Sequence, residues 1–161
     1  MKLFKGKKAL VLVLSIIMVF GLVGCGDSKS SETVKCTVSI ACENLVKDQA
    51  GVKEEVLKIV PKDGVVLKET EVEVNKGETI FDATEKVCKD NKIPFSYQGS
   101  PDTHTEFIDG IANIFIKDAG KTSGWVYKIN DKMGEKATSE VKISKGDKIV
   151  WGYVKSYKDT I

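Results

Sequence analysis

KGDKIVWGYV (Lys145–Val154) has its largest apolar side chains, Ile149, Trp151 and Tyr153, at every second position. The alternation predicts a β-strand in which Ile149, Trp151 and Tyr153 share one face. Two large aromatic side chains on the same face bury much surface when they are covered, so we expect this strand to contribute to the core.

SGWVYKIND (Ser123–Asp131) has the same pattern, with Trp125, Tyr127 and Ile129 on one face. Aromatic side chains on neighbouring strands stabilise a sheet when they pair across it. We therefore expect most of these side chains to form core. The alternative is that Trp125 stays accessible and contacts a ligand.

Further strands are predicted on both sides of these two. VKCTVSIACE (Val34–Glu43) alternates cleanly, which is typical of a half-buried strand. The other candidates are short: Gly64–Val74, Phe95–Tyr97, Glu106–Ile108, Ile111–Ile116 and Val141–Ile143. Asp109–Gly110 and Ser144–Asp147 are predicted to be hairpin turns.

Two helices are predicted. Asn44–Val60 is charged, has apolar residues at helical spacing and ends at a proline. Thr79 begins a second helix that runs to about Asn91, with Asp82 completing a capping box. One central helix among short strands predicts an α+β domain with a mainly antiparallel sheet and a short N-terminal helix, spanning residues 34–157.

Four separated motifs stand out along the chain: Gly77–Ala83, Ile108–Ile111, Ser123–Asn130 and Gly146–Tyr153. They resemble, in the same order, the motifs of the transcobalamin-like C-terminal domain, a bacterial extracellular family of unknown function that is similar to the β-domain of vitamin B12 carriers. The chain resembles this family over roughly Val72–Val154. One departure is Asn130-Asp131, where the family often has Asn-Gly.

The resemblance implies a noncatalytic ligand-binding domain with cobalamin or a related corrinoid as the candidate ligand, and no required cofactor. In the animal carriers an α/α-barrel supplies the other half of the site, and this chain is too short to contain one. An aromatic platform could stack on a flat tetrapyrrole. The ligand-binding residues that we expect are Tyr97, Phe107, Ser123, Gly124 and Trp125.

The N-terminus has the layout of a secretory signal. Four lysines precede an apolar run, Ala9–Gly24, whose length of about 16 residues is short of the ~20 that a membrane-spanning helix needs. Leu22–Cys25 resembles the lipobox of bacterial lipoproteins. We expect residues 1–24 to be a signal peptide, Cys25 to be lipidated, and residues 25–33 to form a tether. The alternative is an incidental cysteine beside an ordinary cleavage site.

Removal of the signal peptide changes the formal net charge from +2 to −2, because four of the 25 basic residues are lost and all 23 acids remain. A nearly neutral chain gives no indication of nucleic-acid binding, which needs clustered positive charge. The chain contains no arginine, so a bidentate guanidinium contact to phosphate or carboxylate is excluded. We expect lipid anchoring at the outer face of the cytoplasmic membrane in a Gram-positive cell envelope.

Three cysteines remain after Cys25, and export permits disulfide bonds. Cys36 and Cys42 lie six residues apart on one predicted strand, or roughly 20 Å at ~3.3 Å per residue, which disfavours a bond between them. We prefer a Cys42–Cys88 bond, with Cys36–Cys88 or three free thiols as alternatives. No CxxC or paired-histidine spacing predicts a metal site.

Catalysis is not expected, because the chain has neither a GxSxG nor an HExxH motif. His104 lies in a polar loop and could ligate a metal, although an exposed structural histidine is the simpler interpretation. Three hypotheses remain, of which the third, an enzyme of the cell envelope, is only residual. The first is a membrane-anchored surface lipoprotein that captures a small ligand. The second is a surface protein-interaction or adhesin-like module that uses exposed strand edges or aromatic side chains.

Overall fold

The computed structural model describes residues 32–156, 158–159 and 161. They belong to the structural unit Ser31–Ile161, which contains its own hydrophobic core. The signal peptide, Cys25 and most of the tether predicted above lie outside the described residues. Within the described ranges, no helix is both long enough and apolar enough to span a membrane.

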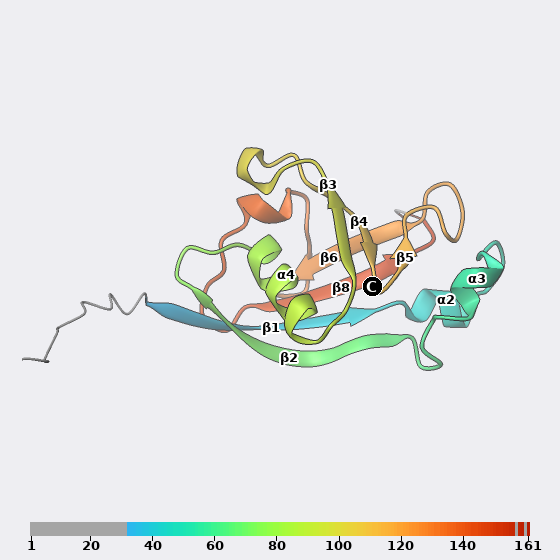
Figure 1. The fold of residues 1–161 in the computed structure, drawn as a ribbon, viewed down its shortest axis with the longest axis horizontal. Coiled ribbons are helices and arrows are strands. Elements are labelled where there is room, and N and C mark those ends of the chain that lie inside the picture. Colours follow the sequence, from blue (N-terminus) through green and yellow to red (C-terminus); the bar gives the residue numbers. More distant parts are fainter. Residues whose placement is uncertain (1–31, 157, 160) are drawn as a thin grey trace, which may run out of the picture. The chain divides into compact units, whose positions relative to one another are not determined.

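A five-stranded mixed sheet has the strand order β2-β1-β8-β6-β7 (Figure 1). β8 pairs antiparallel with β6 and parallel with β1, so strands from the two ends of the described chain lie side by side. The other pairs in this sheet are antiparallel, which confirms the predicted α+β class. The strands are β1 (Thr33–Ala41), β2 (Val65–Asn75), β6 (Gly124–Ile129), β7 (Lys132–Met133) and β8 (Lys148–Val154).

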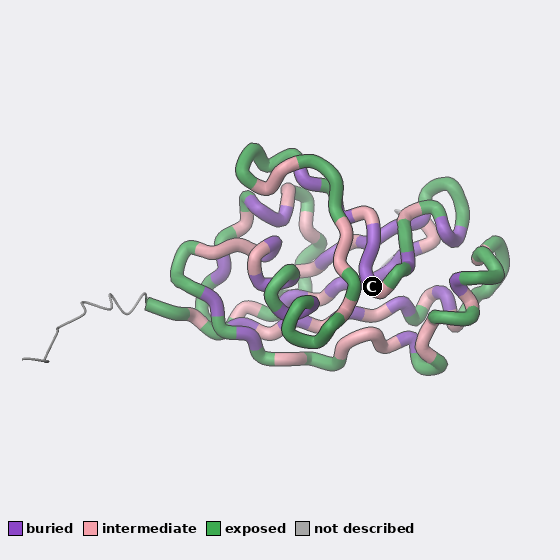
Figure 2. Tube along the Cα trace, in the orientation of Figure 1, coloured by how far each residue is buried: buried purple, intermediate pink, exposed green. Residues whose placement is uncertain are grey.

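The helix α4 (Ile80–Asp90) packs on one face of this sheet over β1 and β2 (Figure 1). Its start is the predicted capping box: the Thr79 side chain accepts a hydrogen bond from the Asp82 backbone N–H, and the Asp82 carboxylate accepts one from the Thr79 N–H. Two orphan N–H groups of the helix end are thereby satisfied. The inward residues of α4 join those of β1, where buried and less buried positions alternate (Figure 2).

A second sheet has three strands, β3 (Phe95–Gln98), β4 (Phe107–Ile111) and β5 (Ile114–Phe115), in sequence order. The prediction that Asp109–Gly110 is the hairpin turn was wrong, because both residues lie within β4. The turn is Ala112–Asn113, with φ values of 55° and 61°. Asn tolerates this left-handed region well, and Ala adopts it here at some cost.

The segment Asn44–Val60, predicted as one helix, forms two short helices, α2 (Glu43–Lys47) and α3 (Glu54–Leu57). Asp48 interrupts it by accepting a hydrogen bond from the Ala50 N–H, as in an Asx-turn. The expected strand Val141–Ile143 is only an isolated bridge between Lys142 and Thr79, so Ser144–Asp147 is a turn before β8 and not a hairpin. Two 3₁₀ turns complete the fold, η1 (Pro101–Thr103) and η2 (Thr138–Glu140).

Candidate functional site

The three-stranded sheet turns one face toward the core and the other toward solvent. Phe95 and Tyr97 of β3 contact the ring of Phe81 on α4, with centroids 5.8 and 4.8 Å apart. Residues that pair across strands share a face, so the partners of Phe95 and Tyr97 also face the core. The other face carries Gln98, which pairs with Phe107, and Gly110, which pairs with Phe115.

Phe107 and Phe115 are exposed on this second face, with 49% and 41% of their surface accessible. The ring of Phe115 lies over Gly110, where a Cβ atom would come within 2.6 Å of two ring carbons. A glycine is therefore needed for the ring to lie flat on the strand. We call the surface formed by Gln98, Phe107, Gly110 and Phe115 the outer aromatic face.

Tyr97 and Phe107, which we expected to form one aromatic platform, lie on opposite faces of the sheet. Phe107 pairs with Gln98, whereas Tyr97 pairs with Ile108 and packs its ring against Phe81. Both side chains are exposed, Tyr97 by 38%. Only Phe107 of the two belongs to the outer aromatic face.

Ser123, Gly124 and Trp125 lie together but inside the protein. Trp125 donates a hydrogen bond from Nε1 to the Ile114 carbonyl (2.8 Å), and Ser123 Oγ lies 2.9 Å from the Tyr153 hydroxyl. Trp125 is 8% exposed and Ser123 1%. In this conformation the expected ligand contacts of these residues are closed off from solvent.

These buried side chains hold β5 in place. Tyr153 donates its hydroxyl proton to the Phe115 carbonyl (2.7 Å), and the Phe115 N–H donates to Asp118 Oδ2 (2.7 Å). The second Asp118 oxygen accepts from Lys53 Nζ at 2.7 Å. With the Trp125 bond to the Ile114 carbonyl, both residues of β5 are hydrogen-bonded from the core side, and these bonds position the backbone that carries the exposed Phe115 ring.

A buried carboxylate joins the loop of η1 to η2. Glu106 is 9% exposed and accepts hydrogen bonds from Thr138 Oγ1 (2.9 Å), Ser139 N (2.8 Å) and Ser139 Oγ (2.8 Å). Burial by itself would raise the pKa of Glu106, but the hydrogen bonds from Ser139 and Thr138 outweigh burial and lower that pKa below its usual value.

His104 Nδ1 lies 2.7 Å from Ser139 Oγ. Because the Ser139 hydroxyl gives its single proton to Glu106, Nδ1 of His104 must be the donor in this contact. The serine thus lies between the histidine and the acid, whereas a hydrolytic triad places the histidine in the middle. Among the described residues, no group of three or more metal-ligating side chains surrounds His104 or any other position.

Cys36, Cys42 and Cys88 are free, buried thiols, in place of the predicted Cys42–Cys88 bond. Cys42 lies where β1 ends and α2 begins, and Cys88 lies on the inner side of α4. Burial raises the pKa of Cys36 and of Cys42 to about 11 and the pKa of Cys88 to about 12. All three are therefore neutral core residues with little thiolate at physiological pH.

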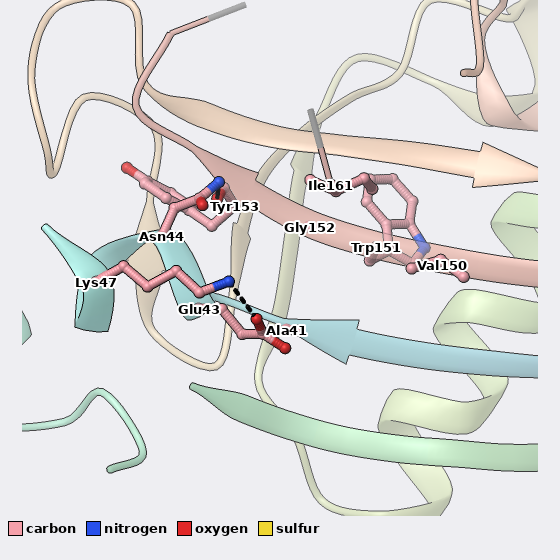
Figure 3. Close-up of a pocket in the computed structure, with 9 residues that line it drawn as sticks. All are labelled: Ala41, Glu43, Asn44, Lys47, Val150, Trp151, Gly152, Tyr153 and Ile161. Atoms are coloured by element: carbon pink, nitrogen blue, oxygen red, sulfur yellow. Dashed lines mark hydrogen bonds and ion pairs between the residues drawn. The ribbon is translucent and has the colours of Figure 1, made fainter. Parts of the chain in front are cut away.

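A pocket of about 170 Å³ lies between α2 and β8 (Figure 3). Lys47 pairs with Glu43 at one side, and Ile161 covers Gly152, where a Cβ would come within 2.1 Å of the isoleucine side chain. Pockets that hold drug-sized ligands usually measure about 300–1,000 Å³. This pocket is thus too small for a tetrapyrrole, and it is separate from the outer aromatic face.

Phe115 and Gly110 are the residues of the site that sequence reasoning missed. The only signal for Phe115 is the alternation of Ile114 and Phe115 next to a short turn, since a residue that alternates with a core residue faces the other way. For Gly110, the Asp-Gly pair was better explained by a turn than by contact with an aromatic ring.

Solved structures share the fold at low sequence identity. Haptocorrin, solved in complex with Cbi, aligns with 78% of this chain at a TM-score of 0.54 and 13% identity, and the match spans 26% of haptocorrin. A protein from Ruminococcus gnavus ATCC 29149, provisionally described as metal-binding, aligns with 77% of this chain and 99% of its own length at a TM-score of 0.45 and 12% identity. No curated protein matches by sequence.

The similarity to haptocorrin shows a shared fold, and the match covers about a quarter of that protein. The sequence motifs that carried the resemblance fall in one segment, from the turn before α4 to the end of β8. This segment, residues 77–155, matches the family model described as a domain of unknown function (DUF4430).

Proposed function

We propose that this chain is a lipid-anchored protein at the outer face of the cytoplasmic membrane, and that its outer aromatic face binds a flat ligand of the corrinoid or tetrapyrrole class without catalysing a reaction. The observation that carries the proposal is the exposure of Phe107 and Phe115, 49% and 41%, on one face of a small sheet. The fold similarity to haptocorrin in complex with Cbi supports the class of ligand.

The energetics indicate that this face is one half of a site. Complete burial of a phenylalanine side chain contributes about 1.5–3 kcal/mol, so covering the exposed half of each ring contributes about 1 kcal/mol. Two such rings fall well short of the roughly 8 kcal/mol that micromolar binding requires. The proposal therefore includes a second surface, supplied by a partner protein, that closes over the ligand. The chain corresponds to only 26% of haptocorrin, which leaves room for such a complement.

Calorimetric titration of residues 26–161 with cobalamin, cobinamide and haem tests ligand binding. This segment includes the unit Ser31–Ile161. Calorimetry is preferable to tryptophan fluorescence because Trp125 and Trp151 are 8% and 2% exposed. We expect weak saturable binding to at least one of the three compounds. Phe107→Ala and Phe115→Ala should each weaken it about fivefold, since about 1 kcal/mol is lost.

Ile59 and Met133 provide matched controls, because they are apolar, 47% and 41% exposed, and outside the outer aromatic face. Their replacement by alanine should leave the affinity unchanged. Equal losses in the control and test variants would mean that binding is nonspecific. No binding of any of the three compounds at millimolar concentration to the folded protein would refute the proposal.

Anchoring has a separate test. Cells that express the full chain should incorporate radiolabelled lipid into the protein, and Cys25→Ala should abolish the label and release the protein from the membrane. Two or more acyl chains on one residue are enough for stable attachment. Persistence of the label in the Cys25→Ala variant would exclude this anchor.

The burial of Trp125 and Trp151 favours a second candidate function, a surface protein-interaction or adhesin-like module. With both tryptophans in the core, no indole is available to line a concave ligand site. The exposed edge strand β2 provides the contact surface for this alternative.

A further inference from the structure

β2 is an edge of the five-stranded sheet. Among the described residues it pairs only with β1, so backbone N–H and C=O groups on its other side have no strand partner there. The register with β1 is irregular opposite Val38–Ala41 and regular from Thr70 to Val74. Bulges obstruct the addition of a further strand, so Thr70–Val74 is the part of this edge that can accept one.

A groove of about 420 Å³ runs along the same part of β2. Its floor includes two apolar side chains, Val72 of β2 and Val87 of α4, which are 5% and 2% exposed. Lys86 and Asp90 form an ion pair across one turn of α4 at its wall (3.1 Å).

The opposite face of β2 is acidic. Glu69, Glu71 and Glu73 alternate along the strand and are exposed. Glu69 pairs with Lys148 (3.0 Å) and Glu71 with Lys35 (2.6 Å). Glu73 accepts a hydrogen bond from the Thr33 hydroxyl and has no ion pair among the described residues. Three carboxylates thus face two ammonium groups, and the excess negative charge lies at Glu73.

We propose that Thr70–Val74 is a docking edge that receives an extended segment of a partner protein as an additional β-strand. The segment carries Lys or Arg at alternate positions, facing Glu71 and Glu73, and small apolar side chains at the positions between, facing the groove. Main-chain hydrogen bonds give such complexes their affinity, and the alternate side chains give them specificity. This inference does not depend on the outer aromatic face, which belongs to the other sheet.

A second copy of this chain is a poorer occupant than a basic segment. Two β2 strands paired antiparallel around Thr70 would place Glu71 of one copy opposite Glu69 of the other. Like charges directly opposite each other destabilise a strand pair. The acidic face therefore favours a partner of opposite charge and disfavours self-association.

The test uses backbone amide NMR and hydrogen exchange on residues 26–161 with three capped hexapeptides: alternating Lys and Val, the same residues as a Lys block followed by a Val block, and alternating Glu and Val. The alternating Lys–Val peptide should shift the amide signals of Thr70–Val74 and slow their exchange. The block peptide should bind at least fivefold more weakly, because only alternation places every lysine on the acidic face. The Glu–Val peptide should not bind.

Glu73→Gln should weaken binding of the alternating peptide several-fold and reduce its salt dependence. Glu55→Gln on α3 is the matched control, since it removes one exposed carboxylate from an element outside the β2 edge, and it should have no effect. Circular dichroism verifies that both variants fold. Equal binding of the two Lys–Val peptides, signal changes away from β2, or dimerisation through β2 in sedimentation experiments without peptide would each overturn the proposal.

Discussion

The inner face of the large sheet and the outer aromatic face of the small sheet both carry aromatic side chains on strands, yet one set is buried and the other exposed. Every buried tyrosine or tryptophan of the inner face has a polar tip with a hydrogen-bond partner, as buried polar atoms require. These residues are Trp125, Tyr127, Trp151 and Tyr153. Phe107 and Phe115 have no polar tip, and no described element covers them. Aromatic content thus identifies strands but does not identify the surface that can bind.

The largest loss of stability is expected when the buried side chain of Trp151 is removed. Its side chain is 2% exposed, and Nε1 donates to Thr84 Oγ1 at 3.0 Å. Trp151→Ala should lower the free energy of unfolding by about 3–5 kcal/mol, because it leaves a large cavity. Phe107→Ala should cost less than about 1 kcal/mol. Urea unfolding measures both, and equal losses would show that the two faces do not differ in burial.

A smaller effect is expected for the polar tips. Tyr153→Phe removes the hydroxyl that accepts from the Asp118 N–H and donates to the Phe115 carbonyl, so it should cost about 1–3 kcal/mol. Tyr97→Phe is the matched control, because no hydrogen bond of the Tyr97 hydroxyl is present among the described residues. Its melting temperature should hardly change, and thermal unfolding measures both variants. A neutral Tyr153→Phe variant would contradict the role given to this hydroxyl.

The contribution of the buried Glu106 carboxylate to stability should depend on pH. Its pKa is lowered in the folded protein, so ionised Glu106 stabilises the fold fully above its unfolded pKa of about 4.3, and this contribution is lost as the pH falls through the lower folded pKa. Glu106→Gln should cost about 1–2 kcal/mol at pH 7, because buried donors lose a charged acceptor.

The difference between wild type and Glu106→Gln should shrink as the pH falls below about 4, where the wild-type carboxyl also becomes neutral. Denaturant unfolding across pH 2.5–7 measures it. Glu85→Gln, an exposed position on α4, should show a small and nearly constant difference. A Glu106→Gln difference that stays constant with pH would mean that the charge of Glu106 does not stabilise the fold.

Gly110→Ala should have the smallest effect on stability, below about 1 kcal/mol, because the Phe115 ring that occupies the Cβ position is exposed and can move away. The same substitution should disturb the outer aromatic face by displacing that ring. We therefore expect weakened ligand binding with an almost unchanged melting temperature. A large loss of stability would instead place Phe115 among the core residues.

Local patterns in the sequence were enough for much of the fold. The capping box at Thr79 fixed the start of α4, and strict alternation in the first strand predicted both β1 and its buried face. The neighbouring residues gave no reason to reject a turn at Asp109–Gly110, because an Asp-Gly pair favours a hairpin turn unless another contact requires the glycine. Only the pairing of Gly110 with Phe115 reveals that contact.

The candidate site was less predictable for the same reason. Phe107 and Trp125 were both ligand candidates; Phe107 is exposed, whereas Trp125 lies in the core, where it joins the two sheets. Alternation assigns residues to two faces of a strand but does not say which face another layer will cover. That depends on contacts between residues far apart in the chain.

The sequence by itself determined the α+β class, the mainly antiparallel strands and the central capped helix, because these follow from short-range periodicity and hydrogen bonding. The tertiary structure decided that β1 pairs in parallel with β8, that Tyr97 and Phe107 point to opposite sides, and that β2 remains an open edge. Those outcomes depend on long-range packing, in which distant segments compete to cover the same apolar surface, and no local pattern encodes the result of that competition.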